Sequence, residues 1–570
     1  MKDKILAILK QLLPDDTQIE LSVPEQSIFG DYSTNVAMKV YGSEDEKKSH
    51  IEKAKDLVDK INKIAPNGFF KKIEVAGPGF INFWLSNNAI QDEFFNIINV
   101  ENYGRNEDGK GKTIIVEYSS PNIAKTLNVG HLRNTIIGEA LSNIFEFSGY
   151  NVIRWNYLGD WGTQFGKLIY AYKTWGKKEE VEKNPVEELQ KLYVRFHEAA
   201  KEDEKIEKIA QEEFKKLENG DKENYELWKW FRDESIIELN KIYAEIGARF
   251  DVWIGESFFE KEMKSIVSDL SDRGITKRSE GAMVIFLDEF NLPPALIEKS
   301  DGASLYLTRD IANLRYRIEK YHPEKIFYIT GSEQIFQFQQ LFAVAKVLNM
   351  TSAELYHITY GLVLGEGGKK LSTREGRTIS IKEILDKAIQ YASDAVSNKD
   401  SNIEESERMK IAKIVGVGAI KFNDLKENRM TNIVFNWDKM LSFTGESGPY
   451  LQYTYARLKN ILKKADFENI KNISRKDTEL LEDDLDRALM LKIFEFPDIV
   501  KKSEDLLMTS VLANYLYKLA SVANKYYETI PIIKDENENR KLARLILIKK
   551  ASDVLKDGLA LLGIEVLEKI

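Results

Sequence analysis

The sequence predicts a multidomain α/β protein in which a doubly wound parallel sheet lies between an N-terminal α+β module and a C-terminal α-helical bundle. Three observations predict this class. The chain has 570 residues, more than one hydrophobic core supports, so several domains are expected. Apolar strand patterns alternate with helical patterns from about residue 112 to about residue 361, which is typical of a parallel sheet. From about residue 385 onward the pattern is helical.

The composition is that of an ordinary globular protein, with 43% hydrophobic and 30% charged residues. The chain contains no cysteine, which excludes disulfides, thiolate zinc sites and cysteine nucleophiles. The sequence has no signal-peptide pattern and no stretch with the apolar length of a membrane span, so we expect a cytoplasmic protein without membrane contact. The net charge of −9 argues only weakly against nucleic-acid partners, because binding needs a local basic surface rather than a basic total.

An N-terminal α+β module is expected over residues 1–108. Helical patterns flank a turn-rich stretch, a strand pair follows, and the polar, glycine-containing stretch 101–112 predicts a domain boundary. The last strand carries Phe80, Phe83 and Trp84 close together. Alternation by itself favours packing in a core or sheet for these aromatic side chains. The alternative is a platform on which an unpaired base stacks.

A strand, a polar turn and a helix follow one another after this boundary. Residues 113–118 form an apolar, β-branched strand pattern, and the cluster of turn formers at 119–122 ends it. A helical pattern begins near Gly130 and His131. The unpaired N–H groups and the dipole at a helix N-terminus favour anions, and Asn128 and His131 can add side-chain donors there. The stretch therefore predicts a site for nucleotide phosphates.

The same alternation predicts a Rossmann-like domain over residues 109–385. A highly charged helical pattern at about 170–250 predicts an insertion of solvated helices. Gly159, Gly162 and Gly166 do not have the spacing of a dinucleotide fingerprint, and no P-loop pattern occurs. Strand patterns occur in 113–118, 151–157, 250–259 and 281–287, and at the beginnings of 300–321, 324–348 and 355–381.

Polar residues recur where these strands end. The carboxyl ends of parallel strands meet at one edge of a sheet, so these side chains are expected to converge on one pocket. Any single one of them is more often a cap or a hydrogen-bonded turn residue, and only their shared position makes a site plausible. The residues are Glu117, Asn122, Asp160, Gln164, Glu256, Tyr306, Asp310 and Gln334.

The stretch 355–381 runs from an apolar strand into a glycine-rich, basic and hydroxyl-rich loop. The loop contains Lys369, Lys370, Ser372 and Thr373. As charge alone, such a loop is usually a solvated turn. As glycine with lysine and hydroxyl groups, it suits a mobile lid that closes cationic donors over phosphates. The loop alone favours neither interpretation. The predicted phosphate site near Gly130 favours the lid, because such a site needs cationic donors on its other side.

The last part of the chain is expected to be helical throughout. Residues 386–430 form a connecting helical segment, and residues 431–570 form an α-helical bundle. Tyr450, Tyr453 and Tyr527 lie in this bundle and are either core or groove-lining residues. Tyrosine beside arginine and lysine is also what base stacking uses.

Taken together, these stretches resemble the arginyl-tRNA synthetases, a family of class I aminoacyl-tRNA synthetases. SSPNIAKTLNVGHLR resembles that family's version of the HIGH signature, and KLSTREG resembles its KMSKS loop. The resemblance covers essentially the whole chain, with its motifs in the family's order. The other matching stretches are NYLGDWGTQFG, SDGASLYLTRD, GESGPYLQYTYARL and the closing LGIEV.

The resemblance implies an arginine–tRNA ligase that works in two steps. The arginine carboxylate attacks the α-phosphorus of ATP, pyrophosphate leaves, and the terminal adenosine of tRNA(Arg) then takes the arginyl group. Mg²⁺ is expected on the phosphates and zinc is not expected. The implied catalytic residues are Lys125, Asn128, Gly130, His131 and Lys370, and the implied ATP-binding residues are Asn128, Gly130, His131, Lys369, Lys370, Ser372 and Thr373.

The resemblance also implies an arginine pocket with Asp310 as the guanidinium partner, because a carboxylate pairs with the planar guanidinium fork at two points. The N-terminal aromatic residues resemble the surface that meets the D-loop corner of tRNA, and the tyrosines of the bundle resemble positions that face the anticodon loop. The implied arginine-binding residues are Glu117, Asn122, Glu256, Tyr306, Asp310 and Gln334, and the implied tRNA-binding residues are Phe80, Phe83, Tyr450, Tyr453 and Tyr527.

Three positions depart from the family pattern. Asn128 replaces the first histidine of the HIGH signature, Thr373 and Arg374 stand where class I loops have a second lysine, and Ile570 stands where the family often ends in methionine. Two alternatives therefore stay open: a class I synthetase for another amino acid, and a non-catalytic tRNA-binding paralogue. A monomer is expected, because no long exposed apolar heptad occurs.

Overall fold

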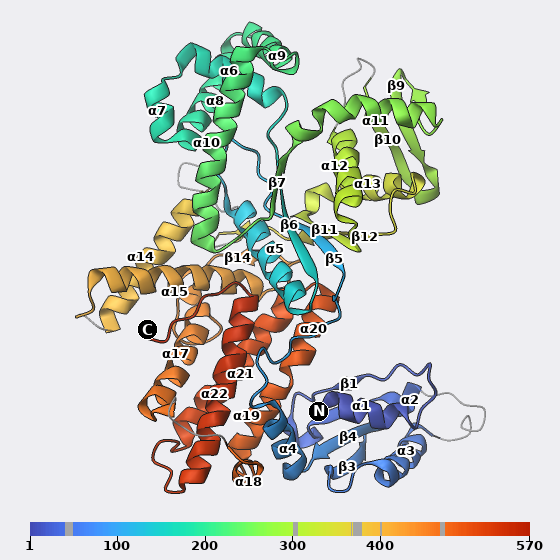
Figure 1. Ribbon diagram of the computed structural model, residues 1–570, viewed down its shortest axis with the longest axis vertical. Helices are drawn as coiled ribbons and strands as arrows, with labels where there is room; N and C mark the ends of the chain where they lie inside the picture. Colours follow the sequence, from blue (N-terminus) through green and yellow to red (C-terminus); the bar gives the residue numbers. More distant parts are fainter. Residues whose placement is uncertain are drawn as a thin grey trace.

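The computed structural model describes residues 1–39, 49–299, 306–365, 368, 379–399, 402–467 and 473–569. It confirms the predicted fold class. A central parallel sheet carries a helical insertion and a small antiparallel sheet at one end of the molecule, and the C-terminal bundle and the N-terminal module lie side by side at the other (Figure 1). None of the helices in the described ranges combines the length and apolar character that a bilayer crossing needs.

The N-terminal module is built on a four-stranded antiparallel sheet with the strand order β1-β2-β4-β3. The helices cover this sheet, and Ile5, Ile61 and Phe94 are buried in the shared core. The elements are α1 (Lys2–Lys10), β1 (Leu21–Ser22), η1 (Ser27–Phe29), β2 (Tyr32–Thr34), α2 (Val36–Lys39), α3 (His50–Ile64), β3 (Phe70–Ala76), β4 (Phe80–Leu85) and α4 (Asn87–Ile97).

The central sheet has five parallel strands in the order β12-β11-β5-β6-β7, with β5 in the middle. Helix α5 follows β5 directly and buries Ile137, Leu141 and Ile144. Because β5 has a neighbour on both sides, the segment after it lies at the centre of the carboxyl edge. The elements are β5 (Thr113–Glu117), α5 (Val129–Phe147), β6 (Asn151–Leu158), β7 (Val252–Gly255), β11 (Lys325–Gly331), η4 (Ser332–Gln334), α13 (Ile335–Val347) and β12 (Glu354–Tyr360).

The strand predicted at 281–287 belongs to a separate sheet and not to the parallel one. Strand β9 (Ala282–Leu287) pairs antiparallel with β8 (Lys277–Ser279) and β10 (Leu292–Glu298). The link from β9 to β10 is a 3₁₀ turn, η3 (Asp288–Phe290), and Asn291 in the left-handed region, which is too short for a parallel crossover. The strand expected at the beginning of 300–321 falls on residues 300–305, outside the described residues, and helix α12 (Tyr306–Tyr321) begins at Tyr306.

The predicted insertion is helical, but its helices are not simply solvated. They bury apolar inner faces against one another, with Phe196, Phe214 and Phe231 in their shared core. The charged residues lie on the outer faces, which explains why the sequence pattern is so polar. The helices are α6 (Thr163–Trp175), α7 (Lys178–Lys183), α8 (Pro185–Glu202), α9 (Lys205–Glu218) and α10 (Lys222–Ile246), and η2 (Glu256–Phe259) and α11 (Glu260–Asp272) follow β7.

The C-terminal part is helical, as predicted, apart from the short strand β14, which pairs in parallel with β13 from the end of the central domain. It contacts the N-terminal module directly. The Gln91 side chain of α4 donates to the carbonyl oxygens of Glu479 and Leu481, both at 3.1 Å. The elements are β13 (Val363–Leu364), α14 (Ile381–Lys399), α15 (Glu405–Leu425), β14 (Ile433–Val434), α16 (Trp437–Met440), α17 (Gly448–Lys464), α18 (Arg475–Thr478), α19 (Asp484–Phe494), α20 (Phe496–Leu506), α21 (Thr509–Thr529) and α22 (Glu538–Leu561).

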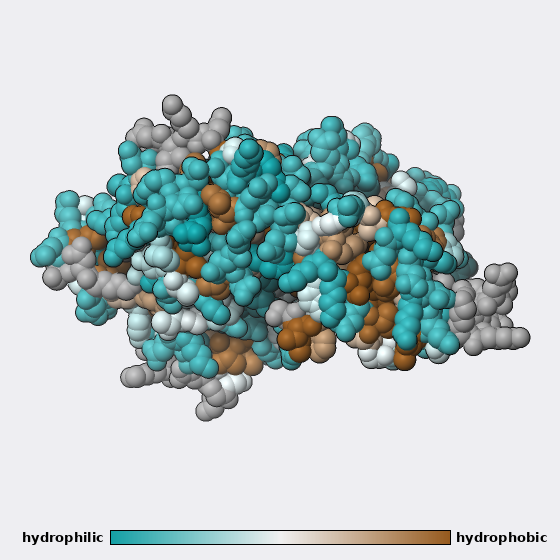
Figure 2. Space-filling view, turned by 90° about the horizontal axis from the view of Figure 1, so that it is seen from below, coloured by the Kyte–Doolittle hydropathy of each residue, from teal (hydrophilic) through white to brown (hydrophobic). Residues whose placement is uncertain are grey.

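The end of the molecule formed by the bundle and the N-terminal module has a mostly hydrophilic surface that is interrupted by hydrophobic areas (Figure 2). Several apolar side chains of the N-terminal module are exposed, among them Val23, Ile28, Phe29 and Phe80. Scattered exposure of this kind is normal on a globular surface. Exposure by itself therefore does not mark a binding residue.

Candidate active site

Helix α5 begins where the sequence predicts a helix start, but two of its first backbone N–H groups already have a side-chain partner. Asn128 is the N-cap, and its Oδ1 accepts from the backbone N–H groups of Gly130 at 2.9 Å and His131 at 3.4 Å. The His131 ring closes a reciprocal contact, with Nδ1 at 3.3 Å from the Asn128 backbone nitrogen. Asparagine is among the best N-cap residues, so the departure from histidine at position 128 has a structural function of its own.

His131 is an uncharged imidazole at neutral pH in this environment. Burial, and the positive charge of Lys125, lower the pKa of His131 to about 4. Nδ1 is also 3.0 Å from Oδ1 of Asn128, and the two Nδ1 contacts require opposite tautomers. Burial lowers the pKa of Lys125, whose Nζ lies 5.3 Å from the centroid of the Tyr193 ring. His131 is therefore suited to donate a hydrogen bond and Lys125 to supply the charge.

The turn between β5 and α5 has an unusual backbone that the sequence did not reveal. Three residues other than glycine have positive φ: Ser119 at 66°, Ser120 at 45° and Ala124 at 59°. Side chains from other elements hold this conformation. Asn134 Oδ1 accepts from Ser119 N at 2.6 Å, Asn156 Oδ1 accepts from Ser120 N at 3.1 Å, and Ser235 Oγ accepts from Ala124 N at 3.2 Å. Strained backbone of this kind concentrates at functional sites, where the surrounding structure fixes it.

Three of the predicted carboxylates converge at the carboxyl edge of the sheet. Glu117 ends β5, Glu256 follows β7, and Asp310 lies in the first turns of α12. All three raise the pKa of the Tyr157 phenol, to which burial contributes most. The Tyr157 hydroxyl is buried and has no hydrogen-bond partner within the described ranges. The shared effect of the three carboxylates on Tyr157 agrees with the prediction that they converge on one site.

Two arginines of the chain itself pair with these carboxylates, and the sequence interpretation missed both. Arg317 forms a fully buried ion pair with Glu117, and its guanidinium lies 4.4 Å from the Trp155 ring centroid. Arg309 Nη1 lies 3.5 Å from Glu256 Oε2. Arg317 is seven residues after Asp310 on α12, so helical spacing alone could have suggested a shared face.

Gln337 completes the group, and it too was missed. Its Nε2 donates to Oδ2 of Asp310 at 2.7 Å. Burial raises the pKa of Asp310 to about 6. The Gln337 hydrogen bond lowers this pKa, and the negative charge of Glu117 raises it further. Burial also raises the pKa of Glu256 to about 7. Two carboxyls with raised pKa values in one place favour a cationic ligand, whose charge would stabilise their anions.

The other strand-end residues differ in burial and in their contacts. Asn122 is exposed and forms a backbone bridge to Gly159, and Gln334 is exposed in η4 at the end of β11. Asp160 is a buried capping residue rather than a pocket residue, because it accepts from the Ser257 backbone at 2.8 Å and hydroxyl at 2.7 Å. Gln164 Nε2 donates to the Gly159 carbonyl at 3.3 Å. The side chain of Tyr306 lies outside the described part of the structure.

The predicted lid residues Lys369, Lys370, Ser372 and Thr373 also lie outside the described residues. The chain that follows them is described from residue 379 and returns to the phosphate site. Ser380 forms a backbone bridge to Asn128, and the Ile381 N–H donates to the Leu127 carbonyl at 2.9 Å.

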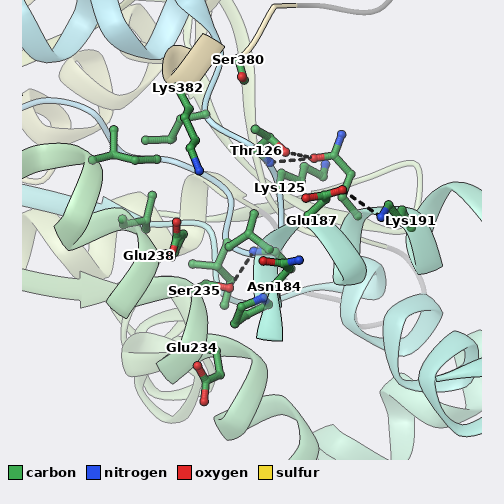
Figure 3. Close-up of a pocket in the computed structure, with 18 of the residues that line it drawn as sticks. Lys125, Thr126, Asn184, Glu187, Lys191, Glu234, Ser235, Glu238, Ser380 and Lys382 are labelled. Carbon is green, nitrogen blue, oxygen red and sulfur yellow. Dashed lines mark hydrogen bonds and ion pairs between the residues drawn. The ribbon is translucent and has the colours of Figure 1, made fainter. Parts of the chain in front are cut away.

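A cavity of about 1250 Å³ borders the phosphate site on the side of the insertion. Its lining includes residues 123–127, parts of α8 and α10, and the start of α14. Gln190 accepts from the Thr126 backbone N–H at 2.9 Å, and Lys382 points into the cavity from α14 (Figure 3). Glu117, Glu256 and Asp310 are not among its lining residues. The cavity is thus adjacent to the phosphate site and separate from the carboxylate group.

One of the predicted tRNA contacts needs correction. Phe83 is fully buried and packs on Phe70, with ring centroids 5.4 Å apart, so it cannot stack on a base while β4 is folded. Phe80 on the same strand is 40% exposed, because side chains three positions apart on a strand point to opposite faces of the sheet. In the bundle, the Arg457 guanidinium lies 5.0 Å from the Tyr453 ring and 5.1 Å from the exposed Tyr527 ring.

Tyr450 lies beside this arginine–tyrosine group on α17. Its hydroxyl accepts from Asn524 Nδ2 at 3.0 Å, and its ring centroid is 5.7 Å from that of Tyr517. The side chain is partly buried and has an internal partner on α21. Tyr450 therefore packs within the bundle, and part of its side chain stays exposed to solvent.

Comparison with known proteins identifies the family. Three family models match: tRNA synthetases class I (R), catalytic domain, over residues 94–437; the DALR anticodon binding domain over 451–570; and the arginyl tRNA synthetase N terminal domain over 1–85.

The arginine–tRNA ligase of Fusobacterium nucleatum is 40% identical, covering 98% of this chain and 96% of its own. That of Pediococcus pentosaceus is 42% identical and covers 99% of each. The crystal structure of Plasmodium falciparum arginyl-tRNA synthetase superposes with a TM-score of 0.83 at 26% identity, over 100% of this chain and 98% of that one. The chain therefore belongs to the arginyl-tRNA synthetase family of class I tRNA synthetases.

Proposed function

We propose that this protein is an arginine–tRNA ligase that forms arginyl-adenylate from arginine and ATP and transfers arginine to the terminal adenosine of tRNA(Arg). The observation that carries the proposal is the group of Asp310, Glu256 and Glu117 at the carboxyl edge of the sheet, the edge from which β5 leads to α5. In this proposal the carboxylate group binds a cation, the helix start binds an anion, and the two share one edge of the sheet. The names and full-length similarity of the relatives support the same activity.

In the proposed adenylation step, the α5 N-terminus binds the ATP phosphates. The His131 ring supplies a hydrogen-bond donor and Lys125 supplies charge, and Gly130 lets the phosphates approach the backbone closely. Asn128, whose Oδ1 accepts from the backbone N–H groups of Gly130 and His131, fixes the helix start. Mg²⁺ would accompany ATP on its phosphates and lower their negative charge. Catalysis then consists of positioning and charge stabilisation, with no covalent enzyme nucleophile. In this proposal Lys369, Lys370, Ser372 and Thr373 contribute further donors to the triphosphate.

The proposed arginine site uses Asp310 for the guanidinium, with Glu256, Asn122, Tyr306 and Gln334 around the rest of the substrate. Asp310 is held by Gln337 and lies among groups that favour a cation. Lysine would lose the two-point contact with the carboxylate, and ornithine would not reach it. A wrong substrate would leave a partly buried acid without its partner, so binding alone can discriminate and no editing domain is required.

Glu117 has a different role in this proposal from that of Asp310. Its carboxylate is already paired with Arg317 in the interior. It therefore fixes Arg317 and the end of β5. Its negative charge adds to the electrostatic attraction for the substrate arginine, but it makes no direct bidentate contact with it.

For tRNA we propose contacts at both ends of the chain. The module over residues 1–108 meets the D-loop corner through Phe80, and the bundle over 431–570 meets the anticodon loop through Tyr450, Tyr453 and Tyr527. Phe83 is omitted because of its burial. In the sequence, the central domain of 109–385, with its insertion at about 170–250, and the connecting segment of 386–430 lie between these two parts. We further propose that the protein is a cytoplasmic monomer.

Arginine-dependent exchange between ATP and pyrophosphate, measured with and without tRNA(Arg), tests the proposal. Exchange with arginine in the presence of tRNA is the expected result. Exchange only with a different amino acid would make the protein a synthetase of other specificity. Binding of tRNA without exchange for any amino acid would instead leave the non-catalytic paralogue as the correct description.

A further inference from the structure

Arg133 lies two residues beyond His131 on α5, and its side chain is fully buried. Its guanidinium is surrounded by acceptors from elsewhere in the chain. Nη1 donates to the carbonyl oxygens of Gly361 at 2.6 Å and Thr431 at 3.0 Å, and Nη2 donates to that of Arg429 at 3.3 Å. Nε lies 3.3 Å from Oδ1 of Asp424 on α15. The position of the first turns of α5 is therefore tied to these backbone segments.

The two segments that Arg133 holds are also bound to each other. The Gly361 N–H donates to the Arg429 carbonyl at 2.8 Å, and the Ile433 N–H donates to the Leu362 carbonyl at 2.9 Å. A Cβ atom at Gly361 would lie 2.4 Å from the Thr431 carbonyl oxygen, so only glycine permits this approach. The end of β12 and the segment before β14 thus form one unit that receives the Arg133 side chain.

Arg429 extends the same network into the bundle. Its Nη1 donates to the Thr359 carbonyl at 2.6 Å, and its Nε donates to the Leu507 carbonyl at 3.0 Å. Leu507 is the C-cap of α20, with a φ of 54°, and α21 begins two residues later. Asn514 of α21 donates to the Lys426 carbonyl at 3.1 Å, which joins the bundle to the same segment a second time.

We propose that Arg133 and Arg429 are positioning residues that transmit the position of the α20–α21 junction to the ATP-binding end of α5. Neither side chain contacts a substrate in the proposed reaction. Each fixes backbone carbonyls of a shared segment, one from the side of α5 and the other from the side of the bundle. α5 lies directly between the central sheet and the bundle (Figure 1). A tRNA bound on the bundle would then change the affinity for ATP. This inference rests on the proposed function.

Lysine variants separate this proposal from a purely structural role. Lysine keeps the positive charge opposite Asp424 but has no planar fork, so it cannot bind carbonyls of two segments together. A lysine at position 429 likewise cannot bind the Thr359 and Leu507 carbonyls together. Arg429 is only partly buried, so Arg429→Lys is the variant expected to retain the fold. The matched control is Arg544→Lys in α22. Arg544 is a buried arginine that donates to Asp535 at 2.7 Å within the bundle and does not take part in this network.

The experiment measures ATP binding to the full-length protein at equilibrium, without arginine, in the presence and absence of tRNA(Arg). For the wild type, tRNA should lower the ATP dissociation constant about 5-fold or more, the lower end of ordinary coupling between sites. Arg429→Lys should bring this ratio close to 1 while ATP binding without tRNA stays within about 2-fold of wild type. Arg133→Lys should weaken ATP binding about 10-fold in both conditions, as expected for a displaced anion site. Arg544→Lys should keep the wild-type ratio.

The proposal would be overturned if tRNA did not change the ATP dissociation constant of the wild type. It would also be overturned if tRNA lowered this constant in Arg429→Lys as much as in the wild type. Loss of the ratio in Arg544→Lys would overturn it too, because any disturbance of the bundle would then suffice. The exchange assay above distinguishes this failure from failure of the proposed function. If the protein lacks arginine-dependent exchange but tRNA still changes its ATP affinity, the positioning role of Arg133 and Arg429 stands and the ligase function is wrong.

Discussion

The side-chain amide of Gln337 donates a hydrogen bond of 2.7 Å to Oδ2 of Asp310, joining α13 to α12 at the carboxyl edge of the central sheet. An ionised carboxylate has about four lone-pair sites, so one amide contact leaves room for a guanidinium fork. The bond holds the acid in one orientation before any substrate is present. Preorganisation of this kind lowers the entropic cost of binding.

Asp310→Asn should raise the KM for arginine about 10- to 100-fold, because it removes the charge that makes hydrogen bonds to a guanidinium strong. The KM for tRNA should change little. Steady-state charging assays with each substrate varied in turn measure both constants. Asp269→Asn, at an exposed ion pair on α11, serves as the matched control and should leave both constants unchanged. Wild-type arginine kinetics in Asp310→Asn would show that the guanidinium binds elsewhere.

The KM for arginine should depend on pH through Glu256 and Asp310. Their pKa values are raised to about 7 and about 6, and only the anions attract a cation. The KM should therefore be constant above about pH 8 and rise as the pH falls through these two values. Arginine binding should release protons in this range, which calorimetry in two buffers detects. In Glu256→Gln the step near neutrality should disappear, and its persistence would assign that step to another group.

The KM for ATP should show no ionisation of His131 between about pH 5.5 and 8, because its pKa is lowered to about 4. His131→Gln keeps one hydrogen-bond donor and should retain more activity than His131→Ala. The kcat of pyrophosphate exchange in His131→Ala should fall by about 10²- to 10³-fold, as for loss of one preorganised donor. Equal activities of the two variants would mean that the ring does not donate to the phosphates.

Arg317→Met should destabilise the protein by about 3–5 kcal/mol, because it leaves the buried Glu117 carboxylate without its partner. Urea unfolding followed by tryptophan fluorescence measures the loss, and Trp155 beside Arg317 reports on this region. The double variant Glu117→Gln/Arg317→Met removes both charges and should recover a large part of the stability. A double variant less stable than Arg317→Met would contradict this account of the pair.

Phe80 and Phe83 on one strand provide a matched pair for tRNA binding. Phe80→Ala should weaken tRNA binding by about 1–3 kcal/mol, the usual value of one base–aromatic stack, and leave stability nearly unchanged. Phe83→Ala should cost about 3–5 kcal/mol of stability as a cavity in the core. Nitrocellulose filter binding and urea unfolding measure the two effects. Unchanged tRNA binding in Phe80→Ala would remove this residue from the interface.

The sequence by itself determined the features that depend on neighbouring residues. The β5–turn–α5 unit and the helical insertion follow from local periodicity and from the chemistry of turns. The family resemblance follows from motifs that are short and contiguous. The clustering of Glu117, Glu256 and Asp310 could be predicted as well, because carboxyl ends of parallel strands share one edge.

Only the tertiary structure decided which distant residues meet. Glu117 pairs with Arg317, which is 200 positions away, and Arg133 binds carbonyls more than 220 positions beyond it. The burial of Phe83 and the separate hairpin at β9 also depend on pairing between strands. Such contacts leave no fixed spacing in the sequence, because chain folding sets the distance between the partners. The phosphate site could therefore be predicted from one stretch of sequence. The distant residues that hold this stretch in place could be identified only in the folded chain.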